Sequence, residues 1–596
     1  MSVLLQVAKQ LGVNPKLLRY GSRTPGAIPD VILMKVSDRP LSTSAKPAIS
    51  SQSSRPSLSS NTPGQHRVGT KSTERSASQA SQFEPASFLS HDHSHVDLLT
   101  KSKAPTDTIN SSHKSKTMGG EDFPYKQVNK NQIPEIFALY LPGVDPLPYR
   151  AAAEVFPTRV NNYVLENHIN WANGVEDPYF KLVIPSPGML SPAMLEEVMA
   201  LLLLKSSAAT RNEKVLASQR LRDAVQKYQQ EYLNAHPAGQ VENKPKLDGC
   251  EVQGLQHKYR ETALWFPSEA QTCHAWCTYC FRWQQFTDVG GPSKQFKSAS
   301  WLNLLDYISK HKQITDLLFT GGDPMVMTAK TFRNYLGPLL HNPHTAHLDT
   351  IRIGTKSLAY WPRKFTTDKD AKATLQMFRD VVNSGKNLSI QAHFTHPREL
   401  DTPEVQEAIK AIKETGAVIR CQSPIVRGIN DSADIWTEMW KKEVKLGMIP
   451  YYMFVERDTG AKEFFELPLA KVFKIYNETR SCVSGLARGA QGPSMSAKPG
   501  KVQILDIVEH KDGRKSFLCT FIQARHPAWV GRTFHAEYSE TATWLDGDNG
   551  LYAFDDDKFF WEDEYAALVK TQEGSSGQWN VTNDRWNKLE KKKAEN

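Results

Sequence analysis

The feature that most restricts the fold is a regular alternation of two sequence patterns between residues 255 and 455. Short apolar runs that suit strands are followed by segments whose apolar residues recur at helical spacing. The expected strands are 263–266, 316–319, 350–353, 388–394, 417–421 and 451–455, and the expected helices lie near 300–312, 328–341, 369–384, 403–415 and 433–446. Six such repeats predict an α/β fold, in which right-handed crossovers curl a parallel sheet into a partial barrel with helices outside. Functional residues then lie at the carboxyl ends of the strands.

Three cysteines, Cys273, Cys277 and Cys280, follow the first expected strand. A short loop with this CxxxCxxC spacing can wrap one face of a cuboidal iron–sulfur cluster, so that each thiolate reaches a different iron. Because no fourth cysteine follows at regular spacing, one iron of a 4Fe-4S cluster held this way is open to another ligand. The alternative is a zinc knuckle, which would need a fourth cysteine or histidine at short spacing. His274 lies inside the loop, where it cannot easily turn back onto the same metal.

A glycine turn, Thr320-Gly321-Gly322-Asp323-Pro324, follows the second expected strand. Paired glycines let a ligand approach the backbone closely and leave strand-end amides and carbonyls free to bond it. Gly-Gly-Asp alone is a common turn. Its position at the end of the strand after the cysteine loop favours a role in ligand binding.

Composition adds a few further limits. A length of 596 residues allows roughly three or four domains. The net charge of +9 can come from an unstructured basic arm, so it is weak evidence for a nucleic-acid partner. The other four of the 7 cysteines are scattered, which argues against a disulfide framework and for a reducing compartment, cytoplasm or mitochondrial matrix. No apolar run approaches the ~20 residues of a membrane span.

Residues 1–120 are expected to form a disordered arm. Residues 1–38 are basic and acid-poor, which is compatible with a mitochondrial presequence, although an ordinary terminus explains them equally well. Residues 39–118 are rich in Ser, Pro, Thr and Lys and cannot bury enough apolar surface to fold alone. Three histidines in this segment, His91, His93 and His95, are better explained by chance than by a metal site.

Three further regions flank the expected barrel, which spans 251–460. Residues 121–250 are predicted to form a helical lead-in and a linker, with Ser191 and Pro192 at the start of one helix. Residues 461–505 form a short segment of their own. Residues 506–596 are predicted to be a small β-rich appendage with a charged tail, whose expected strands are 517–522, 531–538, 541–544 and 550–554.

Eight short segments occur in a characteristic order along the chain. They are 255–259, the cysteine loop with Arg282, 320–324, 351–355, 393–397, 422–423, 427–431 and 450–452. Together they resemble the lysine 2,3-aminomutase family, whose members are radical S-adenosylmethionine (SAM) enzymes that also use pyridoxal phosphate (PLP). The resemblance covers roughly 250–505 and excludes the N-terminal arm and the tail. It implies a 4Fe-4S cluster on the three cysteines, SAM at its open iron, and Gly321, Gly322 and Asp323 around the methionyl amine of SAM.

The same resemblance implies that Lys501 binds PLP covalently. In that family an arginine and a Ser-Gly pair precede a glycine-rich turn that ends in the PLP lysine. The corresponding residues in this sequence are Arg480, Ser484, Gly485, Pro499, Gly500 and Lys501. Lys498 is the alternative, and Lys258 and Gln422 are further implied cofactor-binding residues. A lysine must lose its proton to attack an aldehyde, which burial favours.

The resemblance also implies the reaction. The cluster donates an electron to SAM, the resulting 5′-deoxyadenosyl radical takes a hydrogen from Cβ of an amino acid held on PLP, and nitrogen migrates from Cα to Cβ. Arg282 matches the family's arginine for the substrate carboxylate, which a planar guanidinium suits; a surface or cluster-tuning arginine is the alternative. The implied partners are a small-molecule amino acid and an electron donor for the cluster, with no nucleic acid and no membrane. Self-association into a homo-oligomer is expected from the family.

Departures from the family pattern bear on the substrate. The lysine-specific enzymes hold the distal ammonium with two aspartates, and alignment without gaps places Arg457 and Ser494 at these positions. An arginine repels an ammonium and attracts a carboxylate, so an acidic or other amino acid such as glutamate is expected instead of lysine. The phosphate-binding segment also departs, with Lys258-Tyr259-Arg260-Glu261-Thr262 where the family tends to have a second arginine after an acid. The family's C-terminal zinc site has no counterpart, so no such zinc is expected.

Two other functions stay open. One is a radical-SAM enzyme on this scaffold that acts on a protein-bound lysine. The other is a non-enzymatic basic iron–sulfur protein that binds nucleic acid through its Lys-rich ends. The motifs argue against the latter, because they specify a substrate site instead of base-stacking aromatics with interleaved basic residues.

Overall fold

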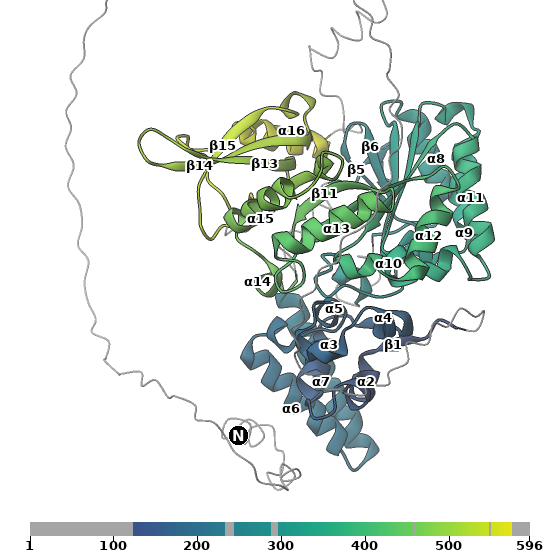
Figure 1. Cartoon of the computed structure of the whole chain (residues 1–596), viewed down its shortest axis with the longest axis vertical. Helices are drawn as coiled ribbons and strands as arrows, with labels where there is room; N and C mark the ends of the chain where they lie inside the picture. Colours follow the sequence, from purple (N-terminus) through teal and green to yellow (C-terminus); the bar gives the residue numbers. More distant parts are fainter. Residues whose placement is uncertain (1–122, 233–242, 288–295, 458–459, 547–549, 575–596) are drawn as a thin grey trace, which may run out of the picture. The chain divides into compact units, whose positions relative to one another are not determined.

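A computed structural model describes residues 123–232, 243–287, 296–457, 460–546 and 550–574 (Figure 1). The expected N-terminal arm, with its targeting segment and histidines, and the Lys-rich end of the tail lie outside the described residues. Within these ranges, no helix combines the length and the apolar character that crossing a lipid bilayer requires.

The described chain begins with a helical region, as the sequence predicts. Its elements are β1 (Gln127–Asn129), α2 (Ile133–Tyr140), α3 (Leu147–Val155), β2 (Arg159–Asn161), α4 (Asn162–Asn167), α5 (Pro178–Val183), α6 (Pro192–Ser207) and α7 (Arg211–Glu231). The predicted helix start is confirmed, because the Ser191 side chain accepts a hydrogen bond from the Met194 amide and Pro192 is the first residue of α6. Helices α3, α6 and α7 pack against one another.

An eleven-stranded mixed sheet forms the centre of the rest. Its strands are β5 (Leu255–Tyr259), β6 (Thr262–Trp265), β7 (Asp316–Phe319), β8 (Thr350–Thr355), β9 (Asn387–His393), β10 (Val418–Ile425), β11 (Ile449–Val455), β12 (Gln491–Ser496), β13 (Gly500–Glu509), β14 (Lys515–Ala524) and β15 (Thr533–Glu537). Neighbours in the sheet follow chain order. Strands β6 to β12 run parallel, and β5 and β13 to β15 are antiparallel to their neighbours. The six predicted strands and their parallel order are confirmed.

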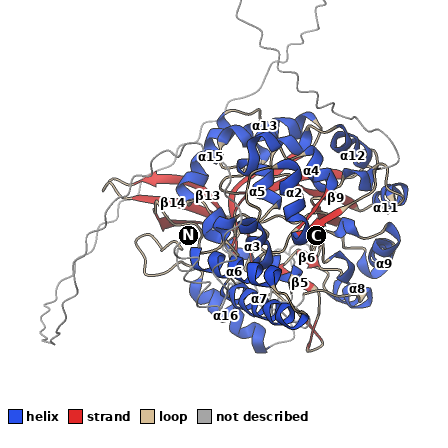
Figure 2. Cartoon of the chain, turned by 90° about the horizontal axis from the view of Figure 1, so that it is seen from below, coloured by secondary structure: helices blue, strands red, loops and turns tan. Residues whose placement is uncertain are grey.

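The predicted helices lie on the outer side of the strands (Figure 2). They are α8 (Trp301–Lys310), α9 (Ala329–Leu340), α11 (Ala371–Asn383), α12 (Pro403–Lys413) and α13 (Ala433–Lys445), joined by α15 (Leu469–Ser481). The two faces of the parallel strands differ in burial: on β8, Ile351 and Ile353 are fully buried, whereas Arg352 and Gly354 on the other face are half-buried. Polar residues gather on this half-buried face, which carries the candidate site.

The tail corrects one prediction. Strands β13, β14 and β15 continue the central sheet instead of forming a separate appendage. The expected strands 517–522 and 531–538 correspond to β14 and β15, but 541–544 contains no strand and 550–554 contributes only a bridge at Ala553. Short hairpins join β13 to β12 and to β14, with Ser496 opposite Lys501 and Glu509 opposite Lys515. The link to the parallel strands is the pairing of β12 with the distant β11, which residue propensities could not reveal. A helix, α16 (Glu562–Gly574), follows.

The sheet curves without closing. Its strand order ends at β5 and β15, and these two strands do not pair with each other. Strand β14 nevertheless contacts β5, so distant parts of the strand order approach each other. Gly500 allows β13 and β14 to come together at this end, because a Cβ atom there would lie 2.4 Å from the Gln523 carbonyl oxygen. Curvature of this kind agrees with the predicted partial barrel, which stays a prediction.

Candidate functional site

The cysteine loop follows β6 and is held in place by the N-terminal helical region. The Trp276 amide donates to the Arg159 carbonyl over 2.8 Å, and the Thr278 amide donates to the Leu182 carbonyl over 2.9 Å. Both bonds join main-chain atoms, so they fix the path of the loop whatever its side chains do. The lead-in before the sheet therefore positions the three cysteines.

The glycine turn packs directly on the start of this loop. The Gly322 amide donates to the Ala270 carbonyl over 2.9 Å, and the Asp323 amide donates to the Thr272 carbonyl over 2.7 Å. A Cβ atom on Gly322 would lie 2.4 Å from the Thr272 carbonyl oxygen, and Gly321 has a φ of +147°. Both glycines are thus required to seat the cysteine loop, a role beyond the predicted approach of a ligand.

The Asp323 carboxylate ties the glycine turn to the end of β8. It is 3% exposed and accepts hydrogen bonds from the Thr355 hydroxyl at 2.7 Å, the Lys356 amide at 2.9 Å and the Ser357 hydroxyl at 2.9 Å. Burial raises the pKa of Asp323, and these bonds oppose that effect. These bonds hold Asp323 between the glycine turn and the end of β8, and its predicted contact with SAM stays a prediction.

Cys273, Cys277 and Cys280 are free thiols, and each is half-buried. Burial raises the pKa of Cys273, and the charges of Asp323, Cys280 and Cys277 raise it further. Thiols in such surroundings ionise together only beside a positive centre, such as the irons of a cluster. The Tyr360 hydroxyl lies 3.0 Å from Cys277 Sγ, where it can donate a hydrogen bond to a thiolate.

Arg282 connects the loop to the glycine turn. Its guanidinium donates to the Gly321 carbonyl over 3.2 Å. Burial lowers the pKa of Arg282 to about 10, the charge of Cys280 opposes this, and the charge of Arg457 adds to it. The guanidinium carbons of Arg282 and Arg457 lie 5.1 Å and 4.7 Å from the centre of the same Phe281 ring. The two arginines proposed from the sequence are therefore neighbours.

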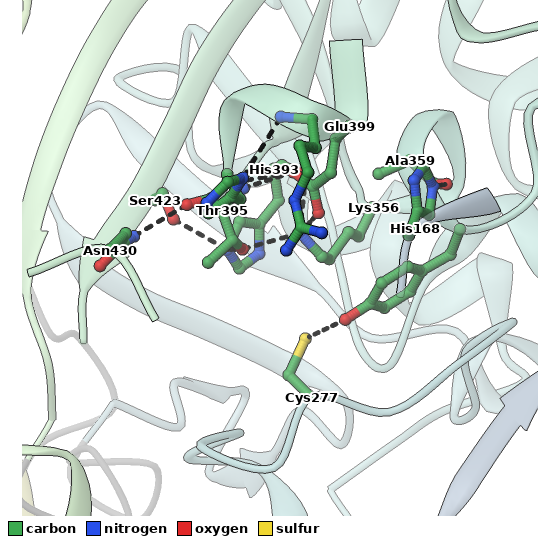
Figure 3. Close-up of polar contacts among 12 residues, drawn as sticks. His168, Cys277, Lys356, Ala359, His393, Thr395, Glu399, Ser423 and Asn430 are labelled. Atoms are coloured by element: carbon green, nitrogen blue, oxygen red, sulfur yellow. Dashed lines mark hydrogen bonds and ion pairs between the residues drawn. The ribbon is translucent and has the colours of Figure 1, made fainter. Parts of the chain in front are cut away.

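A buried set of polar side chains adjoins the cysteine loop at the ends of β8 and β9 (Figure 3). Lys356 Nζ lies 2.7 Å from Glu399 Oε1 and 2.8 Å from the Thr395 hydroxyl. Burial lowers the pKa of Lys356 to about 7 and raises that of Glu399. Whether both groups are charged or both neutral, the pair has no net charge. We term Lys356, His393, Thr395 and Glu399 the neutral network.

His393 links this network to the loop. The Tyr279 hydroxyl lies 2.9 Å from His393 Nε2. The Ser423 hydroxyl lies 3.3 Å from the same nitrogen (Figure 3). Burial lowers the pKa of His393, and the charge of Lys356 lowers it further. Because Tyr279 directly precedes Cys280, the cysteine loop is joined to β9 and β10 by neutral hydrogen bonds.

Lys501 lies near the start of β13, and its side chain turns onto the half-buried face of the sheet. Its Nζ lies 4.1 Å from the centre of the Tyr452 ring and 5.5 Å from that of Phe454. Lys498, the alternative, is exposed. The geometry therefore favours Lys501 as the lysine that meets a buried ligand.

The surroundings of Lys501 favour its neutral form. Burial lowers its pKa to about 7, the charges of Arg352 and Arg457 lower it, and the charge of Asp316 raises it. Arg352 and Asp316 form an ion pair of 2.6 Å on the neighbouring strands β8 and β7. A large share of the amine is thus unprotonated near pH 7, as attack on an aldehyde requires.

Four basic side chains lie around the start of β13. Lys258 is 9% exposed and donates a hydrogen bond to the Ala497 carbonyl. Burial lowers its pKa, the charges of Arg525, Arg457 and Lys501 lower it further, and only Asp546 among these charges opposes them. We term Lys258, Arg457, Lys501 and Arg525 the cationic cluster. Its basic side chains can interact with an anionic ligand.

Two predicted residues have different settings. Gln422 on β10 is opposite His393 on β9 and Tyr452 on β11, so it lies between the neutral network and the cationic cluster. Ser494 on β12 is fully buried, with its hydroxyl 3.5 Å from the Met453 carbonyl. A substrate would reach Ser494 only after local rearrangement, so its predicted contact with the substrate stays a prediction.

Comparison with known proteins gives a family. No protein-family model matches the chain. A protein of Aquifex aeolicus, provisionally named L-lysine 2,3-aminomutase, is 32% identical over 302 residues, which are 51% of this chain and 76% of that protein. The chain belongs to the lysine 2,3-aminomutase family.

Relatives in the lysine 2,3-aminomutase family have more than one named substrate. The L-lysine 2,3-aminomutase of Clostridium subterminale is 27% identical over 240 residues, 39% of this chain and 52% of that protein. The glutamate 2,3-aminomutase of Clostridioides difficile is 25% identical over 215 residues, 36% of this chain and 47% of that protein. The chain spans about half the length of these two relatives, and family membership alone does not identify its amino acid.

The lysine 2,3-aminomutase resemblance gave no role to Lys356, Glu399 or Arg525. Glu399 had a usable signal: it follows His396 at capping-box spacing, and its carboxylate accepts bonds from the Thr395 and His396 amides. Arg525 had none. Its bond to the Lys498 carbonyl depends on the antiparallel pairing of β13 with β14, which the sequence pattern did not reveal.

Proposed function

We propose that the chain is a radical-SAM, PLP-dependent 2,3-aminomutase that moves an amino group from Cα to Cβ of a free amino acid. Family membership supports an aminomutase. The observation that carries the proposal is the Lys501 amine, half-buried against Tyr452 with its pKa lowered to about 7. An amine of this kind suits covalent capture of an aldehyde.

The residues present fit the cofactors that the family uses. Cys273, Cys277 and Cys280 would hold three irons of a 4Fe-4S cluster and leave one iron for SAM. Lys501 would hold PLP, beside cations that suit a phosphate. When bound, the cluster and SAM supply a radical that removes hydrogen, and PLP supplies the π-system through which nitrogen moves.

The chain's own residues would orient the substrate and exclude water. Thr395 and Glu399 are fully buried, so the neutral network forms a dry wall beside the cysteine loop. Excluding water protects reactive radical species from side reactions. Arg282, held by the Gly321 carbonyl next to the loop, would bind a substrate carboxylate through its planar guanidinium.

We infer an acidic amino acid such as glutamate as the substrate. Arg457 shares the Phe281 ring with Arg282, so two guanidiniums lie close together. Two carboxylates on one substrate would neutralise both, whereas a lysine ammonium would be repelled by the second. A relative named glutamate 2,3-aminomutase agrees with this inference.

The direct test is anaerobic reconstitution with iron, sulfide, PLP, SAM and a chemical reductant, followed by a screen of amino acids for β-isomers. We expect conversion of glutamate and little conversion of lysine. Conversion of neither, in protein that carries both cofactors, would contradict the aminomutase proposal.

Two cysteine variants control for non-specific iron. Cys277→Ala is expected to lose the cluster and all activity, because it removes one of three ligands. Cys482→Ala changes an exposed cysteine elsewhere and should behave as the wild type. A Cys277→Ala protein that kept its activity would exclude radical chemistry at this loop.

A further inference from the structure

The short helix α10 (Ser357–Tyr360) follows β8 and contacts the cysteine loop at both of its ends. Its first residue, Ser357, has its hydroxyl 2.8 Å from His274 Nδ1. Its last residue, Tyr360, has its hydroxyl 3.0 Å from Cys277 Sγ, and Figure 3 draws this contact at Cys277. Tyr360 lies outside the segments that carry the family resemblance. The helix thus brings a tyrosine hydroxyl to one of the three predicted cluster ligands.

A side chain of the N-terminal region fixes Tyr360 against the loop. Asn161 Nδ2 donates to the Tyr360 carbonyl over 2.9 Å and to the His274 carbonyl over 3.1 Å. Asn161 is fully buried, and its Oδ1 accepts from the Val164 amide over 3.0 Å. Because the polar atoms of this amide are all bonded, the bridge is rigid. It fixes the distance between the Tyr360 backbone and the cysteine loop.

The hydroxyl of Tyr360 is the donor in its contact with Cys277 once iron binds. A cysteine that binds a metal has lost its proton, so its sulfur can only accept a hydrogen bond. Tyr360 is 1% exposed, and among the described residues Cys277 is the one hydrogen-bond partner of its hydroxyl. The Tyr279 hydroxyl also lies near Cys277, but it has His393 and Thr395 as further partners. The proton of Tyr360 is therefore directed at the sulfur.

A hydrogen bond to a ligand sulfur changes the free energy of adding an electron to a cluster. Reduction places one more negative charge on the irons and their thiolates, so a donor to sulfur stabilises the reduced form more than the oxidised form. The effect is stronger for a buried donor such as Tyr360, because the local dielectric constant is low.

We propose that Tyr360 donates a hydrogen bond to the Cys277 ligand of the 4Fe-4S cluster and thereby raises the reduction potential of that cluster. Tyr360 is then a positioning residue for electron transfer, because it acts through Cys277 and touches neither SAM nor substrate. It makes the cluster easier to reduce by the electron donor that the family resemblance implies. The proposal rests on the cluster of the proposed function.

The test is a redox titration of the full chain loaded with its cluster and without SAM, followed by the electron paramagnetic resonance signal of the reduced cluster. Tyr360→Phe keeps the ring and removes only the hydroxyl. We expect it to weaken the electron affinity of the cluster about tenfold, which is a midpoint potential about 60 mV lower. Tyr163→Phe is the matched control, because it removes the hydroxyl of a buried tyrosine that bonds Thr402 over 2.9 Å. It should leave the potential unchanged.

A fluorinated tyrosine at position 360 tests the sign of the effect. Fluorine withdraws electrons from the ring and makes the hydroxyl a stronger donor, so the midpoint potential should rise above that of the wild type. A residue that only supports the loop would not shift the potential in opposite directions in the two variants. Should Tyr360→Phe lose its cluster, the potential of the fluorinated protein decides alone.

Two results would overturn the role of Tyr360. One is an unchanged potential in both Tyr360 variants, and the other is an equal fall in Tyr360→Phe and Tyr163→Phe. Wild-type protein that assembles no 4Fe-4S cluster on its three cysteines would instead contradict the proposed function.

Discussion

The neutral network and the cationic cluster both bury a lysine, but they compensate its charge differently. Lys356 is 7% exposed and has the Glu399 carboxylate 2.7 Å away. Lys258 is 9% exposed and donates to a backbone carbonyl, near three other basic side chains and one carboxylate, that of Asp546. A buried lysine beside a carboxylate is complete without a ligand, whereas one near other basic side chains is stabilised by whatever brings negative charge. The comparison indicates a wall at the network and a binding site at the cluster.

The largest expected effect is on Lys501, in the cationic cluster, and leaves the cysteine loop unchanged. Lys501→Ala should abolish the absorbance of covalently bound PLP, because it removes the nucleophile. The iron content and the spectrum of the iron–sulfur cluster should not change, since the cysteine loop is held by other elements. Lys498→Ala, which alters an exposed lysine three residues earlier, should retain both signals. Retained PLP absorbance in Lys501→Ala would move the attachment site elsewhere.

The next effect breaks the neutral network. Glu399→Gln leaves Lys356 without its buried counter-charge and should lower the free energy of unfolding by about 3–5 kcal/mol. Urea unfolding of the cofactor-free protein measures it. The double variant Lys356→Met/Glu399→Gln should recover part of the loss, because no buried charge is then left. Lys258→Met in the cationic cluster should lower the free energy of unfolding much less than Glu399→Gln, since it relieves repulsion. Equal losses of unfolding free energy in the two variants would refute the comparison.

A smaller effect reverses one charge near the cluster. Arg457→Asp should shift the ratio of kcat/KM for glutamate and lysine toward lysine by about a hundredfold, or about 3 kcal/mol. The physical reason is that a carboxylate attracts the ammonium that an arginine repels. Arg480→Asp, at an exposed position on α15, should leave the selectivity as it is. Unchanged selectivity in Arg457→Asp would show that this side chain does not face the substrate.

The smallest effect is on pH dependence. Since the pKa of Lys501 is lowered to about 7, its amine is neutral above that pH and protonated below it. The rate of PLP capture should therefore level off above pH 7 and fall about tenfold for each pH unit below it. A model compound with an ordinary lysine amine should show the same fall only below about pH 10. Arg457→Met should move the profile of the protein upward by less than one unit, because it removes a nearby positive charge. A profile that rises up to pH 10 in the wild type would contradict the buried setting of Lys501.

The core of the fold could be predicted from the sequence because its signals are local. The strand 316–319 has the bounds of β7, and the helix predicted near 433–446 matches α13 within one residue at each end. Each of these segments shows its periodicity within one short window. The cysteine spacing and the glycine turn were equally local, and the structure brings them into contact.

Features that depend on distant pairing could not be predicted in this way. Strands β13 to β15 belong to the central sheet because their hairpins continue from β12, and β12 pairs with β11 across a long connection, which no local pattern reveals. The pairing of Lys356 with Glu399 joins residues from two βα connections. The position of Arg525 beside Lys498 depends on the pairing of β13 with β14, and no strand was expected at 500–509. The sequence therefore predicted residues that act through a motif and missed those that act through topology.

The pairing of β14 with β13 has a practical consequence for anyone who shortens the chain. A fragment trimmed near residue 505, to the extent of the family resemblance, would leave β13 incomplete and without its partner β14. An exposed sheet edge of this kind recruits other chains and promotes aggregation. Poor solubility of such a fragment would therefore reflect where it was cut and not the stability of the intact chain.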